Sequence, residues 1–564
     1  MRTESFNVIS ASMKKRGLLY LFCCLQLTAS ARQNMPVVVP PVFKADTISI
    51  IQHGAKGDGV FLNTQSIQAT IDAVHARGGG VAEVPAGLWH TGPIVLRSGV
   101  NLYLAAGSTL LFTRDLDQYP LVEANWEGLP QMRNQSPISA TDAFNIGITG
   151  KGIVDGNGDA WRMVKKDKLT ASQWKKLVSS GGVLSKDEKT WYPSEQSLKG
   201  SGLTNPGQIS PEKDMAFFES VKDFLRPNLL LLTQCKYILL EGVTFQNSPA
   251  WCLHPLMSEH LTVRNISVKN PWYAQNGDGI DVESCRYVLI ENSVFDVGDD
   301  ALCMKSGRDA EGRKRAMPTQ DVIIRNCTVY SSHGGFVIGS EMSGGVKNVH
   351  VSNCTFIGAD IGLRFKTTRG RGGVVENIYI RDIYMKDIPG EAILFDMYYA
   401  ARDPVPMAGE KRELPKVELK PVDETTPVFR NFTITNVYCN GAEKAVFIRG
   451  VPEMAVSNIE FNNLVITSKK GLDIQEADNI RFNNVQLNTS ESDPLIEIIQ
   501  SKNIQLNGIQ FKKDIPLLTR VNGERSGNIQ ITNTKTADAA KDVQFELGAN
   551  ADALKIISSP KAKK

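Results

Sequence analysis

An eight-residue pattern of alternating apolar and polar positions recurs along the chain between about residues 230 and 512. Val, Ile and Leu fill most apolar positions, and a small or polar residue, often Asn, stands near the middle. Clear copies begin at Ile238, Leu261, Val288, Val322, Val349 and Ile378, and further copies begin at Phe432, Ile459, Ile480 and Ile504. The copies are mostly about 21 to 34 residues apart, which is typical of solenoid repeats.

The alternation and the richness in β-branched residues favour strands over helices. The central Asn or Gly suits a tight turn, because these residues tolerate left-handed backbone angles. Two strands and one turn in each repeat indicate one coil per repeat, and stacked coils bury their inward faces against one another. We therefore predict an all-β fold, a right-handed parallel β-helix (solenoid).

The repeat also explains most of the cysteines. Seven follow residue 31, and none forms a Cys-x-x-Cys pair, which argues against a zinc site. Cys327 and Cys354 occupy the same place in adjacent repeats, and Cys235 and Cys285 match two coils apart. We expect these side chains to stack inside the solenoid as small apolar residues.

Two segments depart from the repeat. Residues 63–77 carry Ile67, Ile71 and Val74 at helical spacing, and Gly78 to Gly80 end the pattern, so we expect an N-terminal helix that caps the open end of the solenoid. Residues from about 162 to 226 are rich in Lys, Ser, Gly and Pro and predict a long insertion. The expected organisation is a signal peptide over 1–31, a single catalytic domain over 32–535 and a C-terminal tail over 536–564.

The first residues have the pattern of an export signal. A basic stretch at 13–16 precedes a short apolar run, 18–27, and Ala29-Ser30-Ala31 offers a cleavage site after Ala31. A lipoprotein signal at Cys23 or Cys24 is the alternative, disfavoured by the bulky residues before Cys23. We expect a secreted or periplasmic protein with no membrane span.

The net charge of the chain bears on whether it binds nucleic acid. Lysine and arginine number 63 and aspartate and glutamate 60, a net charge of +3. A nucleic-acid-binding domain usually has a clustered basic surface, and the sequence has none. We expect no nucleic-acid partner, no cofactor or metal, and a monomer.

Polar residues interrupt the rhythm in four consecutive repeats. They are Asn276 and Asp278 with Asp281, Asp299 with Asp300, His333 with Gly334, and Arg364 with Lys366. Residues one coil apart lie at the inter-strand spacing, about 4.8 Å. The sequence therefore predicts that they form one patch on a single face.

Such a patch suits the hydrolysis of an acidic sugar. Carboxylates packed closely repel one another, so the pKa of at least one should rise, leaving an acid beside ionised neighbours. Glycosidic hydrolysis needs one group to protonate the leaving oxygen and another to activate water. Arg364 and Lys366 would bind the carboxylate of the sugar. For Asp281 we expect a structural hydrogen bond.

At these positions the chain resembles the polygalacturonase family, glycoside hydrolase family 28. The family motifs Asn-Thr-Asp, Gly-Asp-Asp, Gly-His-Gly and Arg-Ile-Lys stand here as 276–278, 298–300, 332–334 and 364–366, and the likeness covers roughly residues 48 to 512. It implies an inverting, exo-acting hydrolase of α-1,4-galacturonosidic bonds in pectin, with pectic polysaccharide or oligogalacturonide as substrate.

The resemblance also implies roles. Asp299 would be the general acid, Asp278 and Asp300 would hold and deprotonate the attacking water, and His333 would support the acid. Asn276, Gly334, Arg364, Lys366 and Tyr399 would bind substrate, and Tyr398 is the alternative to Tyr399. Three positions depart from the motifs: Gly277 replaces Thr, Ser332 replaces Gly and Phe365 replaces Ile. We expect the last two to be packing changes.

Two other functions remain open at this point. A pectate or pectin lyase on the same kind of solenoid would use calcium or an arginine base, and a non-catalytic carbohydrate-binding β-helix would be unaffected by loss of Asp299. The residues leave endo action open, as well as the choice among homogalacturonan, rhamnogalacturonan and xylogalacturonan. The insertion favours exo action, because a long loop beside a groove blocks one end.

Overall fold

The computed structural model describes residues 35–399 and 418–557. The chain divides into two units, Met1–Val37 and Val38–Lys564, and every element described below belongs to the second. The predicted signal peptide and its cleavage site lie outside the described residues. No helix among the described residues is long and apolar enough to cross a membrane.

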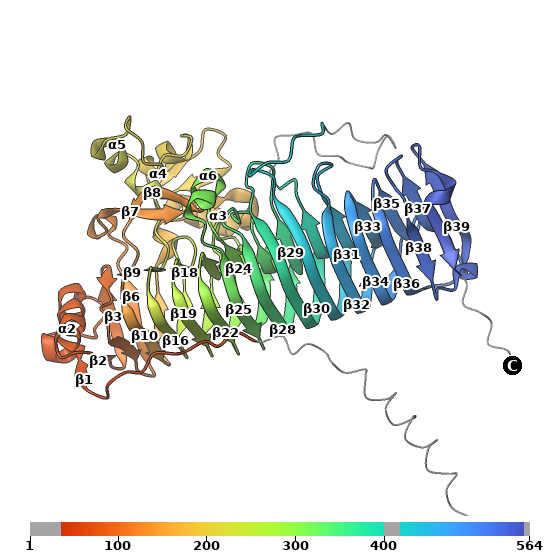
Figure 1. Ribbon diagram of the computed structural model, residues 1–564. Coiled ribbons are helices and arrows are strands. Elements are labelled where there is room, and N and C mark those ends of the chain that lie inside the picture. The colour runs from red at the N-terminus through yellow and green to blue at the C-terminus, as the bar shows by residue number, and fades with distance from the viewer. Residues whose placement is uncertain (1–34, 400–417, 558–564) are drawn as a thin grey trace, which may run out of the picture. The chain divides into compact units, whose positions relative to one another are not determined.

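The second unit is a parallel β-helix, and the predicted right-handed all-β fold is confirmed. Strands of successive coils run side by side from α2 to β39 in Figure 1. One row of parallel partners contains β16 (Lys236–Glu241), β19 (Glu259–Arg264), β22 (Arg286–Glu291), β25 (Thr319–Arg325), β28 (Val346–Ala359) and β30 (Val374–Asp396). A second row contains β18 (Leu253–Leu256), β21 (Ile280–Glu283), β24 (Asp300–Lys305), β27 (Gly334–Ile338) and β29 (Leu363–Lys366).

The register of the coils follows the sequence repeat. Ile238, Leu261, Val288, Val322 and Val349 are direct partners in successive coils, and each is buried. The asparagine of each repeat adopts the left-handed conformation, with φ of 56° at Asn265, 51° at Asn292 and 56° at Asn326. The Asn326 amide donates to Asn292 Oδ1 at 3.0 Å, so the turns are joined from coil to coil.

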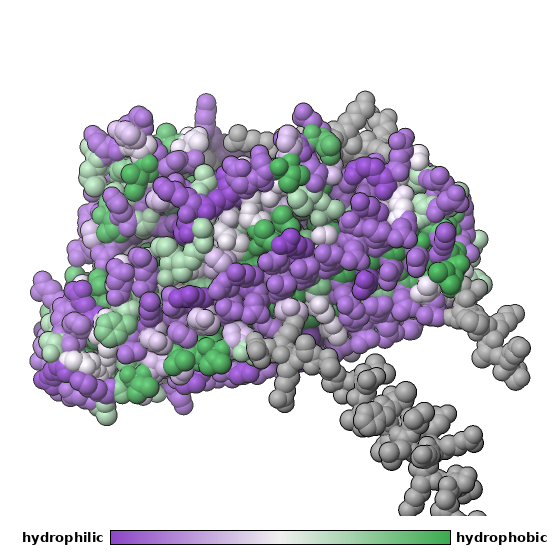
Figure 2. All heavy atoms as spheres, in the orientation of Figure 1, coloured by the Kyte–Doolittle hydropathy of each residue, from purple (hydrophilic) through white to green (hydrophobic). Residues whose placement is uncertain are grey.

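The interior is a single apolar stack. Cys235, Cys285, Cys327 and Cys354 are buried and free, as predicted for the repeat. Phe365 is fully buried and its ring contacts those of Phe336, Phe395 and Phe432, which confirms that this departure from the family motif is a packing change. On the face shown in Figure 2 the surface is largely hydrophilic, with small apolar patches.

Helix α2 (Thr64–Ala76) occupies the predicted N-terminal position and packs on β1 (Thr47–Ser49) and β2 (Gly80–Val84). Its N-cap is Asn63, although the Asn63 side chain does not cap the helix. Its amide instead donates to the carbonyls of Lys56, Phe61 and His90, and so ties the preceding loop to the first coil.

Two segments leave the solenoid on the same side. The chain between β11 (Ile153–Asp155) and β15 (Leu230–Thr233) forms α3 (Ala171–Ser179), α4 (Glu195–Ser201), α5 (Met215–Glu219) and a small sheet of β12 (Val164–Lys165), β13 (Val183–Leu184) and β14 (Thr190–Tyr192). The other segment, which the sequence pattern did not predict, is the hairpin of β7 (Leu121–Trp126) and β8 (Leu129–Asn134). The two meet where Met132 packs with Phe218, Val221 and Leu225. In Figure 1 they gather near α6 (Asp309–Arg315), and the Arg308 amide donates to the Gly128 carbonyl.

The C-terminal stretch assigned to a tail also contains strands. β39 (Ala539–Glu546) pairs with β37 (Ile515–Asn522), and β40 (Leu554–Ile557) pairs with β38 (Ile529–Thr532). The solenoid therefore continues past residue 535. The last coil has a neighbouring coil on one side only and therefore needs fewer apolar positions. Its Ala- and Lys-rich composition for this reason did not predict strands.

Candidate active site

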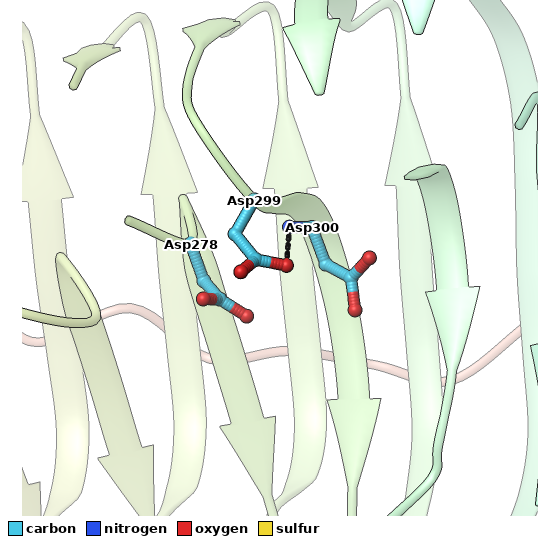
Figure 3. Close-up of side chains that lie close together, drawn as sticks. All are labelled: Asp278, Asp299 and Asp300. Carbon is cyan, nitrogen blue, oxygen red and sulfur yellow. Dashed lines mark hydrogen bonds between the residues drawn. The ribbon is translucent and has the colours of Figure 1, made fainter. Parts of the chain in front are cut away.

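The acidic cluster forms where strands of neighbouring coils begin. Asp278 lies two residues before β21, Asp299 lies immediately before β24, and Asp300 is the first residue of β24. The three side chains converge (Figure 3), and one carboxylate oxygen from each lies within 4.8 Å of the others. The Asp299 carboxylate accepts a hydrogen bond from the Asp300 amide at 3.0 Å. The proximity predicted from coil spacing is confirmed.

The cationic residues surround Asp300. Arg364 Nη1 lies 3.2 Å from Asp300 Oδ1, and Lys366 Nζ lies 2.6 Å from Asp300 Oδ2. Burial opposes ionisation of Asp300, but Lys366 and Arg364 outweigh it and lower the pKa of the carboxyl to about 2. Asp300 is therefore a carboxylate at every pH where the protein would work.

Asp278 has the opposite environment. Its side chain is buried, its Oδ1 has no hydrogen-bond partner among the described residues, and Asp281 and Asp299 lie close by. Burial, then repulsion by Asp281 and Asp299, raise the pKa of Asp278 well above its ordinary value. The pKa of one carboxyl in the cluster is thus raised beside one whose pKa is lowered, as the repulsion argument predicted.

His333 approaches the cluster from the next coil. It lies immediately before β27, and its Nδ1 is 3.0 Å from Asp299 Oδ1. This hydrogen bond raises the pKa of His333 against the effect of burial. On the far side its Nε2 is 3.9 Å from Asp360, a residue that the sequence reading did not single out.

The predicted substrate-binding residues divide into two groups. Tyr399 belongs with the cations, since its ring centre lies 4.7 Å from Lys366 Nζ and 5.6 Å from the Arg364 guanidinium. Gly334 is the β-sheet partner of Asp300, and a Cβ there would meet Val337 Cγ2 at 2.4 Å. Asn276 contacts the insertion instead of these cations, because its side-chain oxygen accepts a hydrogen bond from Arg226 Nη2 at 2.8 Å.

Gly277 suits its own loop. Its amide donates to the Ala274 carbonyl at 3.0 Å, and a Cβ would lie 2.8 Å from both the Cβ and the carbonyl oxygen of Ala274. The threonine of the family motif would therefore force this turn to move. Ser332 is buried and its hydroxyl has no hydrogen-bond partner among the described residues, so it too occupies a packed position.

The expected structural hydrogen bond of Asp281 is wrong. Neither carboxylate oxygen has a hydrogen-bond partner within the described ranges, and the side chain is fully buried. Its nearest cation is Lys305, with Nζ 3.6 Å from Asp281 Oδ1 and 2.9 Å from Glu341 Oε2. Burial raises the pKa of Asp281 well above its ordinary value. Lys305 could have been singled out from the sequence, because it is a lone cation at the end of an apolar strand.

Comparison with known proteins places these features in a family. The family model described as glycosyl hydrolases family 28 matches residues 219–434, which include the whole cluster. The crystal structure of an exopolygalacturonase from Thermotoga maritima is 30% identical, with a TM-score of 0.64, and the match covers 80% of this chain and 93% of that one.

Two curated relatives are also similar. A protein of Dickeya chrysanthemi named exo-poly-alpha-D-galacturonosidase is 28% identical over 464 residues, 79% of this chain and 71% of that protein. A protein of Vitis vinifera named probable polygalacturonase is 30% identical over 353 residues. The match spans 61% of the length of this grape relative, less than two thirds.

Proposed function

This chain belongs to glycosyl hydrolases family 28, and from that membership we propose that it hydrolyses α-1,4-galacturonosidic bonds of pectin from a chain end. The observation that carries the proposal is the three-aspartate cluster with Arg364 and Lys366 on the next coils. Carboxylates in two protonation states supply acid and base, and cations select an acidic sugar. The comparisons do not favour the lyase alternative.

In the proposed reaction, Asp299 protonates the leaving oxygen and Asp300 deprotonates the attacking water. Asp300 is free to accept a proton because Lys366 and Arg364 lower its pKa and keep it ionised. Asp278 holds the water together with Asp300. The pKa of Asp278 is raised, but its carboxyl titrates together with its neighbours, so the proton belongs to the coupled group rather than to one residue. His333 is hydrogen-bonded to Asp299 through Nδ1 and orients it.

The stereochemistry of the reaction is open to a direct test. Carboxyl groups about 5 Å apart usually belong to retaining glycosidases, and inverting enzymes usually have them further apart. The cluster oxygens lie within 4.8 Å, so the spacing alone favours retention, whereas the family resemblance implies inversion. We propose inversion, in which no aspartate forms a bond to the sugar.

Exo action is supported by the walls at one end of the cluster. The hairpin β7–β8 and the insertion approach Asn276, and Arg226 at the end of the insertion contacts Asn276 directly. A chain that is blocked at this end presents only its terminal residues for cleavage. The names of the Dickeya and Thermotoga relatives agree with this mode of attack.

Export is the proposed location. It is supported by the basic and apolar stretches before Ala31 and by a polymeric substrate that lies outside the cell. Sequencing of the N-terminus of the mature protein is the test. A mature chain that begins after Ala31 agrees with the proposal, and one that retains residues 13–31 contradicts it.

Product analysis over time tests the proposed reaction. With polygalacturonate as substrate, we expect single galacturonates from the first minutes, and proton NMR should show the β-anomer before mutarotation. Mid-length oligomers at early times would contradict exo action. An α-anomer appearing first would contradict inversion.

A further inference from the structure

A small cavity adjoins the cluster at Asn276. Its volume is about 140 Å³, and its walls come from the hairpin β7–β8, from the insertion and from the loop before β21. The residues that matter in its lining are Trp126, Glu127, Arg133, Trp161, Arg226 and Asn276. Asn276 lies two residues before Asp278, and Arg226 in the wall interacts electrostatically with Asp278 and Asp299, so the cavity lies beside the reacting groups.

Two arginines of the wall are buried. Arg226 donates from Nη1 to the carbonyls of Pro249 and Gln275 and from Nη2 to the Asn276 side chain. Arg133 donates from Nε, at 3.1 Å, and from Nη2 to the carbonyl of Arg226. All these acceptors are uncharged, and Glu127 pairs with Arg308 instead. Within the described residues, neither guanidinium forms an ion pair.

Two buried cations without an ion pair are costly in such a place. Burial lowers the pKa of Arg133 to about 9 and that of Arg226 to about 10, and the charge of Glu127 opposes the shift at both without cancelling it. A buried charge without a partner destabilises a fold unless something of opposite charge occupies the site. The cavity therefore favours an anion.

The remaining walls suit a sugar ring. The Trp161 indole nitrogen is buried and has no hydrogen-bond partner among the described residues, so a donor is free. Trp126 stacks on Trp251 with ring centres 5.3 Å apart and lies under the Arg133 guanidinium at 3.9 Å. Burial raises the pKa of Glu127, and a carboxyl group of this kind binds hydroxyls.

We propose that this cavity binds the terminal galacturonate ring of the substrate and that Arg226 and Arg133 bind the carboxylate of that ring. The inference rests on the proposed function and adds what recognises the chain end. The volume suits one ring, so the next bond of the chain is brought towards the aspartates. A neutral terminal sugar would leave both guanidinium groups without an ion-pair partner.

Product inhibition of the wild-type enzyme is the first test. Galacturonate and galactose differ at the carboxylate, so galacturonate should inhibit hydrolysis of trigalacturonate about 10- to 100-fold more strongly, as expected of a charge-assisted hydrogen bond. Equal inhibition by the two sugars would overturn the inference. If the wild type does not cleave trigalacturonate at all, the proposed function fails, and this is seen before any variant is made.

Variants assign the discrimination to the cavity rather than to Arg364 and Lys366. Arg226→Gln and Arg133→Gln should each reduce the galacturonate-to-galactose ratio of inhibition about 10-fold or more, and Arg226→Lys should recover part of it. Arg449→Gln is the matched control, because Arg449 is a similarly covered arginine of the same face that already pairs with Asp396 at 2.8 Å. An unchanged ratio in Arg226→Gln and Arg133→Gln would overturn the inference.

A crystal structure of the Asp299→Asn protein with digalacturonate covers the case in which the arginine variants fail to fold. The expected result is a terminal carboxylate at about 2.7–3.2 Å from Arg226 or Arg133 nitrogens. A terminal carboxylate bound elsewhere, with the cavity occupied by solvent, would overturn the inference.

Discussion

Asp278 and Asp300 lie in one cluster, yet their pKa values move in opposite directions. Both side chains are buried, so burial alone would raise the pKa of each. The pKa of Asp300 is lowered instead, because Lys366 and Arg364 contact its two oxygens. The nearest charges to Asp278 are other carboxylates. At the scale of the residue, the direction in which the pKa of each of these two carboxyls moves is decided by the charges that it faces.

Replacing Lys366 tests this division. In Lys366→Met the pKa of Asp300 should rise from about 2, because the first cation that lowers it is gone. Asp300 then protonates at a higher pH, so the acidic limb of the pH profile of kcat/KM should move upward by about 1–3 pH units. Lys444→Met, which removes the partner of Asp473 in a later coil, is the control. An unmoved limb would show that Asp300 is not the base.

Asp278→Asn should stabilise the protein while reducing activity. The pKa of Asp278 is raised in the folded state. Its contribution to stability is therefore present at pH values below the unfolded-state pKa, near 3.9, and is lost as the pH rises towards the folded-state pKa. Asn cannot ionise, so the gain should grow from about pH 4 to about pH 7 and reach on the order of 1 kcal/mol. Thermal unfolding at both pH values measures it. A variant less stable than wild type at neutral pH contradicts this account.

At the scale of the element, the sequence repeat predicted the coils because each copy carries its own turn. Asn265, Asn292 and Asn326 all take the left-handed conformation that the repeat requires. The coil register then predicted that Asp278, Asp299, Asp300, His333 and Arg364 meet, since each lies just before or at the start of a strand at the same level of the stack. Local pattern was sufficient for this part of the site.

Other parts of the site could not be predicted from the local sequence pattern. Arg226 and Arg133 come from the insertion and from a hairpin, which share no period with the coils, and their meeting depends on how those segments fold back. Asp281 follows the strand rhythm, but its lack of hydrogen-bond partners depends on the position of Lys305 on the neighbouring strand and of Glu341 beyond the strand after it. Contacts that depend on packing between segments leave no signal in either segment alone.

At the scale of the whole molecule, stability is shared along the stack, because each coil contacts only its neighbours. The end coils differ, since one side of each lacks a partner. Helix α2 covers the first coil, and β39 and β40 extend the last rows of strands. The C-terminal residues are therefore part of the solenoid rather than a dispensable tail.

Truncation after residue 535 tests this role. The shortened chain should unfold at a lower temperature and aggregate on heating, because β37 and β38 would become exposed edges. Calorimetry and light scattering during heating measure the two effects. An unchanged unfolding temperature would restore the interpretation of residues 536–557 as a tail.

The central claim is that the aspartate cluster performs the hydrolysis. Its most direct test compares wild type with Asp299→Asn on trigalacturonate, measuring turnover by release of reducing ends and affinity by calorimetry. The account predicts a loss of turnover of about 10²- to 10⁴-fold, as for removal of a general acid, with the affinity for trigalacturonate retained. Undiminished turnover in Asp299→Asn would contradict it.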